Sequence, residues 1–176
     1  MARDMTKGRI LPQMTAFAIP LILGNLFQIL YNATDSIIVG KFVGDDALAA
    51  VGTAGPIMNM AILFISGMCM GAGILMSTLY GAKDMKNLEK QISTTLIGGL
   101  VFSLLIAFLM IAFAVPILRL INSPEEIIES AAIYLRVVFL GLIFTFVYNF
   151  LANTLRALGD SRTPLYFLVI SAFLNV

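Results

Sequence analysis

Charged residues are scarce in this sequence: they make up 12% of its 176 residues, where soluble domains contain about 25%. Hydrophobic residues account for 60%, against roughly 45–50% in soluble domains. Histidine is absent, and the single cysteine, Cys69, lies inside an apolar stretch. These shortages exclude an ordinary soluble fold, a zinc site of cysteine and histidine, a thiol–imidazole catalytic pair and an intrachain disulfide.

The basic residues are too dispersed for nucleic-acid binding. The net charge is +1, and lysines and arginines stand at short junctions between apolar runs rather than in a stripe. This pattern excludes DNA and RNA as partners. The apolar runs reach the roughly 18–20 residues that a bilayer crossing needs. The sequence therefore predicts an all-α, polytopic membrane helix bundle that has the lipid bilayer as a partner.

Charged and turn-forming residues divide the chain into five apolar segments. We expect membrane spans at about 11–40, 47–80, 91–118, 126–156 and 165–176. As a straight helix the second segment would exceed a hydrocarbon core about 30 Å thick, so Gly55-Pro56 is expected to kink or restart it. Before the fourth segment, Ser123 is predicted to be the helix N-cap.

The fifth segment, 165–176, has 12 residues. As a helix these would cover only about 18 Å, and a membrane helix that stopped there would leave carbonyl groups unsatisfied in hydrocarbon. We therefore expect the sequence to be a fragment of a longer protein, with about four and a half of its helices present.

The distribution of basic residues predicts the orientation. Lys41 and Arg119 would lie on one side of the membrane. The other side would hold Arg3, Lys7, Arg9, Lys83, Lys86, Lys90, Arg156 and Arg162. By the positive-inside rule, the N-terminus is predicted to be cytoplasmic. The membrane itself is expected to be the plasma (cell inner) membrane. Arg136 and Arg156 bracket the uncharged run 137–155, and we expect each to snorkel outward at an interface.

Asp35 is the acid that stands within an apolar segment. It follows the uncharged run 10–34, and a charge at the centre of a membrane helix costs about 2.5–3.5 kcal/mol, so such a residue is rarely kept without a use. At spacings of three and four it shares a helix face with Gly24, Asn25, Gln28, Tyr31 and Asn32. This polar face is expected to line other helices or a water-filled cavity. The alternative is an interfacial carboxylate near Lys41.

Burial would disfavour the charged form of Asp35 and let it take up and release a proton, whereas among amide oxygens it could bind Na⁺. We leave both ions open as coupling ion, and we expect no other cofactor and no further metal site. A second polar stripe holds Thr145, Asn149, Asn153 and Arg156. It either lines a cavity or joins helices by hydrogen bonds. Pro20 permits a bend in the first span, as a static kink or a hinge.

Several motifs resemble the multidrug and toxic compound extrusion (MATE) family. They are Pro20 with the polar helix that follows it, Gln28-Ile-Leu-Tyr-Asn-Ala-Thr-Asp35, Ala47-Leu-Ala-Ala-Val-Gly52, Tyr80-Gly-Ala-Lys-Asp84 and Arg156-Ala-Leu-Gly-Asp-Ser-Arg-Thr-Pro164. The resemblance covers nearly the whole chain. It implies a transporter of twelve helices in two six-helix lobes, of which residues 1–176 would form part of the N-terminal lobe.

The resemblance also implies an antiporter, not an enzyme, that exports organic, often cationic, small molecules in exchange for Na⁺ or H⁺ by alternating access. It implies that Asp35 and Asn175 belong to the ion-coupling site and that Pro20 is the point where the first helix bends. The lobe cavity would be lined by Gln28, Tyr31 and Asn32, and we add Asn149 and Asn153 from the second stripe.

Three other function classes stay open. A lipid-linked oligosaccharide flippase of related fold would carry more basic residues in its cavity than Arg136 and Arg156. An intramembrane aspartyl enzyme needs two facing carboxylates, and Asp35 is the one aspartate inside a predicted span. A structural or receptor subunit would leave the polar face around Asp35 unexplained.

Overall fold

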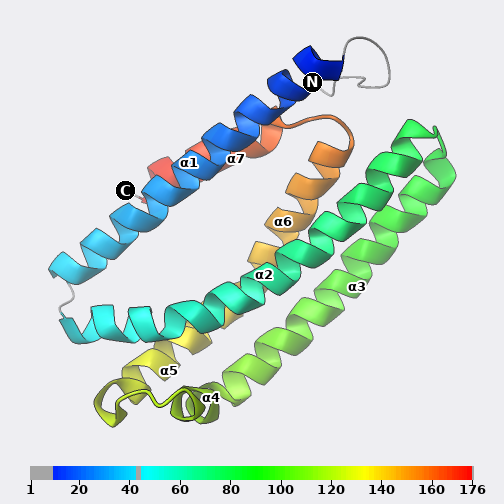
Figure 1. Cartoon of the computed structure of the whole chain (residues 1–176). Coiled ribbons are helices and arrows are strands. Elements are labelled where there is room, and N and C mark those ends of the chain that lie inside the picture. Colours follow the sequence, from blue (N-terminus) through cyan, green and yellow to red (C-terminus); the bar gives the residue numbers. More distant parts are fainter. Residues whose placement is uncertain (1–9, 43–44, 176) are drawn as a thin grey trace. The chain divides into compact units, whose positions relative to one another are not determined.

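The computed structural model describes residues 10–42 and 45–175, and these residues form helices joined by short turns (Figure 1). The helices are α1 (Ile10–Phe42), α2 (Asp45–Gly81), α3 (Met85–Ala112), α4 (Ala114–Leu120), α5 (Glu125–Leu140), α6 (Leu142–Ala157) and α7 (Arg162–Asn175). Within these helices the side chains are described except at positions 10, 31, 32, 35, 36, 39, 40, 42, 45–48 and 172–175.

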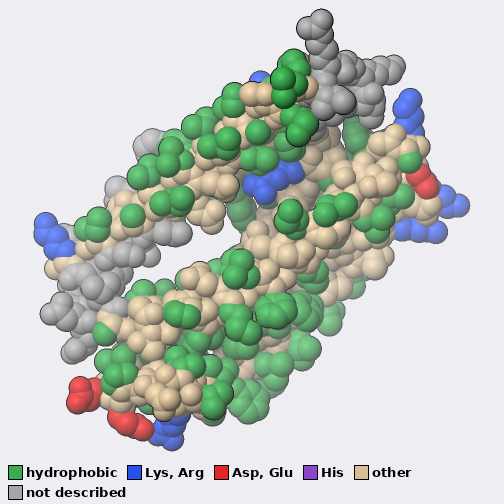
Figure 2. Space-filling model, viewed as in Figure 1, with side chains coloured by type: hydrophobic (Ala, Val, Ile, Leu, Met, Phe, Trp, Pro, Cys, Tyr) green, Lys and Arg blue, Asp and Glu red, His purple; other side chains and the backbone are tan. Residues whose placement is uncertain are grey.

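Three helices contain segments long and apolar enough to cross a membrane, at Leu11–Leu30, Ala49–Gly81 and Met85–Ala112. Helices α5 and α6 are long and apolar enough to cross a membrane only when taken together, and the angle between them is 43°. In Figure 2, hydrophobic side chains cover the flanks of the helices and most charged side chains gather near the helix ends and turns. The predicted all-α membrane fold is confirmed.

The third and fourth apolar segments are each divided in the structure. Helix α3 ends at Ala112 and α4 begins at Ala114. Because Pro116 has no N–H to donate to the Ala112 carbonyl, and its ring clashes with that carbonyl, the helix breaks one turn before the proline. The fourth segment breaks at Gly141, whose N–H donates to the Val138 carbonyl at 3.0 Å. By contrast, α2 continues through Pro56 without a restart.

The N-cap prediction for Ser123 is wrong. Helix α5 has Pro124 at its N-cap, and the Ser123 hydroxyl is buried without a hydrogen-bond partner among the described residues. The cause is the preceding turn, in which Asn122 is left-handed at φ 55° and the Ser123 N–H donates back to Leu118. Ser123 therefore completes the end of α4.

The turns after α2 and α6 share one design. In each, a left-handed residue closes the helix, Lys83 at φ 59° and Gly159 at φ 87°, and the next residue's N–H donates to the carbonyl five positions earlier. That next residue is an aspartate whose carboxylate caps the following helix. Asp84 accepts from the Asn87 N–H at 3.2 Å, and Asp160 accepts from the Thr163 N–H at 3.1 Å.

The chain divides into two compact units. The first unit comprises Met1–Asp35, Cys69–Thr94 and Phe150–Val176, and the second comprises Ser36–Met68 and Thr95–Asn149. Among the described side chains, most of the buried hydrophobic residues belong to the second unit.

The second unit is closely packed. Phe146 of α6 is fully buried, and its ring lies so close to Gly99 of α3 that a Cβ at that glycine would overlap it. Beside this contact the Ser66 hydroxyl of α2 donates to Asn149 Oδ1 at 3.3 Å, and Asn149 Nδ2 donates to the Thr145 carbonyl at 2.9 Å. Apolar packing and interhelical hydrogen bonds both close this unit.

The first unit has looser helix contacts. Helix α7 runs along α1 (Figure 1), and its Leu165 and Leu168 lie 3.7 and 3.6 Å from where a Cβ at Gly24 would stand. Between α6 and α2, the Thr154 hydroxyl is 3.6 Å from Met76 Sδ. These contacts leave space between the helices of this unit.

Candidate functional site

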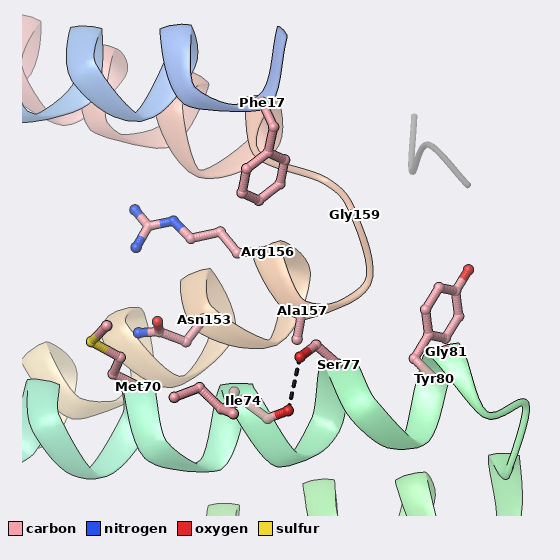
Figure 3. Close-up of a pocket in the computed structure, with 11 residues that line it drawn as sticks. Phe17, Met70, Ile74, Ser77, Tyr80, Gly81, Asn153, Arg156, Ala157 and Gly159 are labelled. Atoms are coloured by element: carbon pink, nitrogen blue, oxygen red, sulfur yellow. Dashed lines mark hydrogen bonds between the residues drawn. The ribbon is translucent and has the colours of Figure 1, made fainter. Parts of the chain in front are cut away.

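A cavity of about 490 Å³ lies within the first unit. Its walls come from α1, α2, the end of α6 and the turn that follows α6 (Figure 3). It is lined by Phe17, Met70, Gly73, Ile74, Ser77, Tyr80, Gly81, Asn153, Arg156, Ala157 and Gly159. Its volume is within the roughly 300–1,000 Å³ of small-molecule sites.

Arg156 supplies the charge of this cavity. Figure 3 shows its side chain extending from α6 into the space between Phe17 of α1 and the α2 wall. Its Nε is buried and has no hydrogen-bond partner among the described residues. Of the described residues that line the cavity, Arg156 is the one that carries a charge. The residue as a whole is half-buried, and its predicted snorkelling to an interface remains a prediction.

Asn153 extends from α6 toward the same side as Arg156 (Figure 3). Gly73 of α2 lies opposite, and a Cβ there would be 3.6 Å from the Asn153 Cβ. The Ser77 hydroxyl donates to the Ile74 carbonyl at 2.8 Å, so its oxygen turns back onto α2. The polar part of the wall therefore comes mainly from α6.

The turn that follows α6 is held by Asp160. Its Oδ1 accepts from the Arg162 and Thr163 N–H groups, each at 3.1 Å, and its Oδ2 accepts from the Thr163 hydroxyl at 2.8 Å. Burial raises the pKa of Asp160, but these hydrogen bonds lower it by more, so the pKa lies below the ordinary carboxyl value. The Asp160 carboxylate therefore caps the first turn of α7.

The structure separates the residues of the second stripe. Asn153 and Arg156 line the cavity of the first unit, whereas Asn149 belongs to the second unit and bonds to Ser66 and Thr145. Helical spacing puts Asn149, Asn153 and Arg156 on one face of α6. Spacing alone could not show that this face is hydrogen-bonded at Asn149 and lines a cavity at Asn153 and Arg156.

On the first stripe, Gln28 has an exposed side chain and is not part of the cavity wall. Pro20 is buried within α1, which is helical on both sides of it. The side chains of Tyr31, Asn32, Asp35 and Asn175 lie outside the described residues. Their proposed roles remain predictions.

Sequence patterns indicate little about the residues of α1 and α2 that line the cavity. Phe17, Met70 and Ile74 are apolar residues in apolar helices, where such residues are common. The one usable signal was the run of small residues Gly67, Gly71 and Gly73, which permits close approach of helices. Of these, Gly73 faces Asn153 in the cavity wall.

Comparison with known proteins shows the family. The MatE family model matches residues 20–176. The chain is 35% identical over 176 residues to the probable multidrug resistance protein YpnP of Bacillus subtilis, covering 99% of this chain and 39% of that protein. It is 23% identical over 170 residues to the multidrug export protein MepA of Staphylococcus aureus, covering 97% and 38%. The chain thus spans well under half the length of these curated relatives.

Solved structures agree with the sequence relatives. Crystal structures described as MATE in the straight conformation and in the bent conformation match with TM-scores of 0.89 and 0.87. In both, the sequence identity is 25%, and the match covers 99% of this chain and 39% of the solved chain. From the family match, the relatives and the shared fold together, we conclude that the chain belongs to the MATE family of membrane transporters.

Proposed function

We propose that the full-length protein exports organic, often cationic, small molecules in exchange for Na⁺ or H⁺. The observation that carries this proposal is Asp35, an acid on a polar face of the otherwise apolar α1, inside the region that matches the family. The printed names of the relatives, multidrug resistance and multidrug export proteins, support a small-molecule substrate.

In this proposal Asp35 is the site of exchange. A carboxylate held in a low-dielectric setting binds a single positive charge favourably, so a proton, Na⁺ or a cationic substrate would compete for it. Asn175 would supply an amide oxygen to the bound ion. Gln28, Tyr31 and Asn32 would hydrogen-bond the substrate along the same helix face, with Asn153 on the α6 side.

Pro20 would serve as the hinge of alternating access. It has no N–H to donate to the Ala16 carbonyl, so α1 lacks one backbone hydrogen bond at that turn. The solved relatives described as straight and bent support a family in which two conformations are accessible. An ion that binds one conformation of α1 more tightly than the other would shift the population between them.

We further propose a plasma-membrane location and, from the distribution of basic residues, a cytoplasmic N-terminus. In that orientation the turns after α2 and α6 face the cytoplasm. A cysteine introduced at Lys86, labelled with a membrane-impermeant maleimide, tests this point. Labelling only after the cells are opened supports the orientation, and labelling of intact cells contradicts it.

The function is tested with the full-length protein in vesicles, by measuring efflux of a cationic dye under an imposed Na⁺ or proton gradient. We expect gradient-dependent efflux, and we expect Asp35→Asn to lower its rate by about tenfold or more, because the amide cannot bind the exchanging cation. Asp84→Asn is the matched control, since asparagine also caps a helix well and Asp84 lies in a turn. Unchanged, gradient-dependent efflux by the Asp35 variant would contradict the coupling role.

A further inference from the structure

The cavity of the first unit has a charge opposite to that needed for a cationic substrate. Its one charged lining side chain among the described residues is Arg156, and no described lining residue is an acid. A guanidinium donor buried without a partner is unfavourable, because the lost hydrogen bonds to water are not replaced. The arrangement therefore calls for an acceptor that bears negative charge.

The planar geometry of the guanidinium favours an acceptor that has two oxygen atoms. Arginine presents Nε and a terminal nitrogen as a planar pair of donors, and this pair matches two oxygens of a phosphate or carboxylate. The Arg156 Nε, which is half of that pair, is the atom left buried without a partner. The free donor edge thus suits an oxyanion better than a single neutral carbonyl.

The remaining walls suit an apolar group attached to that oxyanion. Phe17, Met70 and Ile74 line the same cavity as Arg156 (Figure 3), and Met70 and Ile74 are 64% and 62% exposed. Gly81, Ala157 and Gly159 line the part nearest the turns and take up little space. A volume of about 490 Å³ holds a phosphate together with a short alkyl chain.

We propose that this cavity is a binding site for an amphipathic phosphate, with the phosphate on Arg156 and the apolar tail against Phe17, Met70 and Ile74. The proposal does not depend on the cation exchange assigned to Asp35, although Asn153, which is assigned to the substrate, also lines this cavity. Two sources supply such a molecule: an anionic phospholipid of the bilayer, or a water-soluble alkyl phosphate ester.

Two measurements on the purified full-length protein separate these sources. In detergent, thermal unfolding is followed with a thiol-reactive dye at Cys69, which is buried and reacts when the fold opens. Octyl phosphate is titrated, with octanol as the uncharged control. In nanodiscs, the same unfolding is compared between phosphatidylcholine alone and phosphatidylcholine with phosphatidylglycerol, and native mass spectrometry detects any retained phosphatidylglycerol.

We expect octyl phosphate, phosphatidylglycerol or both to raise the unfolding temperature of the wild type, while octanol does not. Arg156→Gln should weaken the affinity by about tenfold or more, since it removes the charged donor pair. Arg136→Gln is the matched control, because Arg136 is exposed on α5 and does not line the cavity. Stabilisation by one probe alone supports the site and identifies its source.

Absence of any response to either probe would overturn the proposal. An equal loss in the Arg136 variant would overturn it too, because the effect would then follow net charge. If Arg156→Gln does not fold, Arg156→Lys replaces it. Lysine keeps the charge but lacks the planar donor pair, so unchanged affinity in that variant would also contradict the site.

Discussion

The two units use the same helix, α6, in different ways. In the second unit, α6 presses Phe146 against Gly99 and closes Asn149 into hydrogen bonds with Ser66 and Thr145. In the first unit, the same helix presents Asn153 and Arg156 to a cavity. Asn149 and Asn153 are one helical turn apart, so their different surroundings come from the neighbouring helices.

The two units differ in how their helices are held together. The second unit holds its helices by side-chain packing, which resists changes of volume. The first unit contains an open cavity. The described backbone hydrogen bonds outside its helices lie in the turns after α2 and α6. We therefore expect substitutions in the core of the second unit to change the free energy of unfolding more than substitutions in the turns of the first unit.

The largest effect is expected at the glycine beneath Phe146. Gly99→Ala places a methyl group where the buried ring lies, and such overpacking lowers the free energy of unfolding by about 1–3 kcal/mol. Gly98→Ala is the matched control, since nothing lies within 4 Å of a Cβ there. The check is the unfolding temperature reported by the Cys69 thiol. Equal behaviour of the two variants would show that the second unit is not tightly packed at this point.

The next effect concerns the turn after α6. Asp160→Ala removes a carboxylate that accepts three hydrogen bonds, and loss of a helix cap lowers the free energy of unfolding by about 0.5–2 kcal/mol. Asp84→Ala in the other turn should lower the free energy of unfolding by less, because within the described residues the Asp84 carboxylate accepts two hydrogen bonds, both from Asn87. Thermal unfolding of both variants tests this order. A larger loss at Asp84 would contradict it.

The cap formed by Asp160 should also make the stability of the fold depend on pH. Its pKa is lowered in the folded protein, so its contribution to stability is fully present above the ordinary carboxyl pKa and is lost as the pH falls through the lowered value. Unfolding of wild type and Asp160→Asn is compared from neutral to acid pH. We expect the wild type to lose its advantage in the acid range, and a constant difference across that range would count against the cap.

The smallest expected effect is an increase in the free energy of unfolding. Lys83 holds the left-handed position that glycine holds at Gly159, and a residue with a Cβ is strained there by about 1–2 kcal/mol. Lys83→Gly relieves this strain and should raise the free energy of unfolding by about 0.5–1 kcal/mol, after the greater freedom of glycine in the unfolded chain is deducted. Lys86→Gly, inside the first turn of α3, is the control and should be destabilising. Destabilisation by both would show that Lys83 has a role beyond its backbone.

The sequence predicted the fold well because the lengths of apolar runs determine which helices can cross a bilayer. It missed the breaks at Gly141 and near Pro116, since glycine and proline also occur inside continuous helices, as Pro56 does in α2. It also missed the cavity around Arg156. The position of Arg156 near the end of an apolar run is typical of an interfacial arginine, and only the packing of α1 and α2 around it reveals the buried Nε.

The short turn between α2 and α3 has a consequence for membrane insertion. Three residues, 82–84, separate the two helices, and the N–H groups of all three already donate to carbonyls at the end of α2. Two apolar helices joined in this way have satisfied backbone groups at their junction before they meet lipid. They can therefore leave the translocation machinery as one hairpin, with Lys83 and Asp84 in its turn.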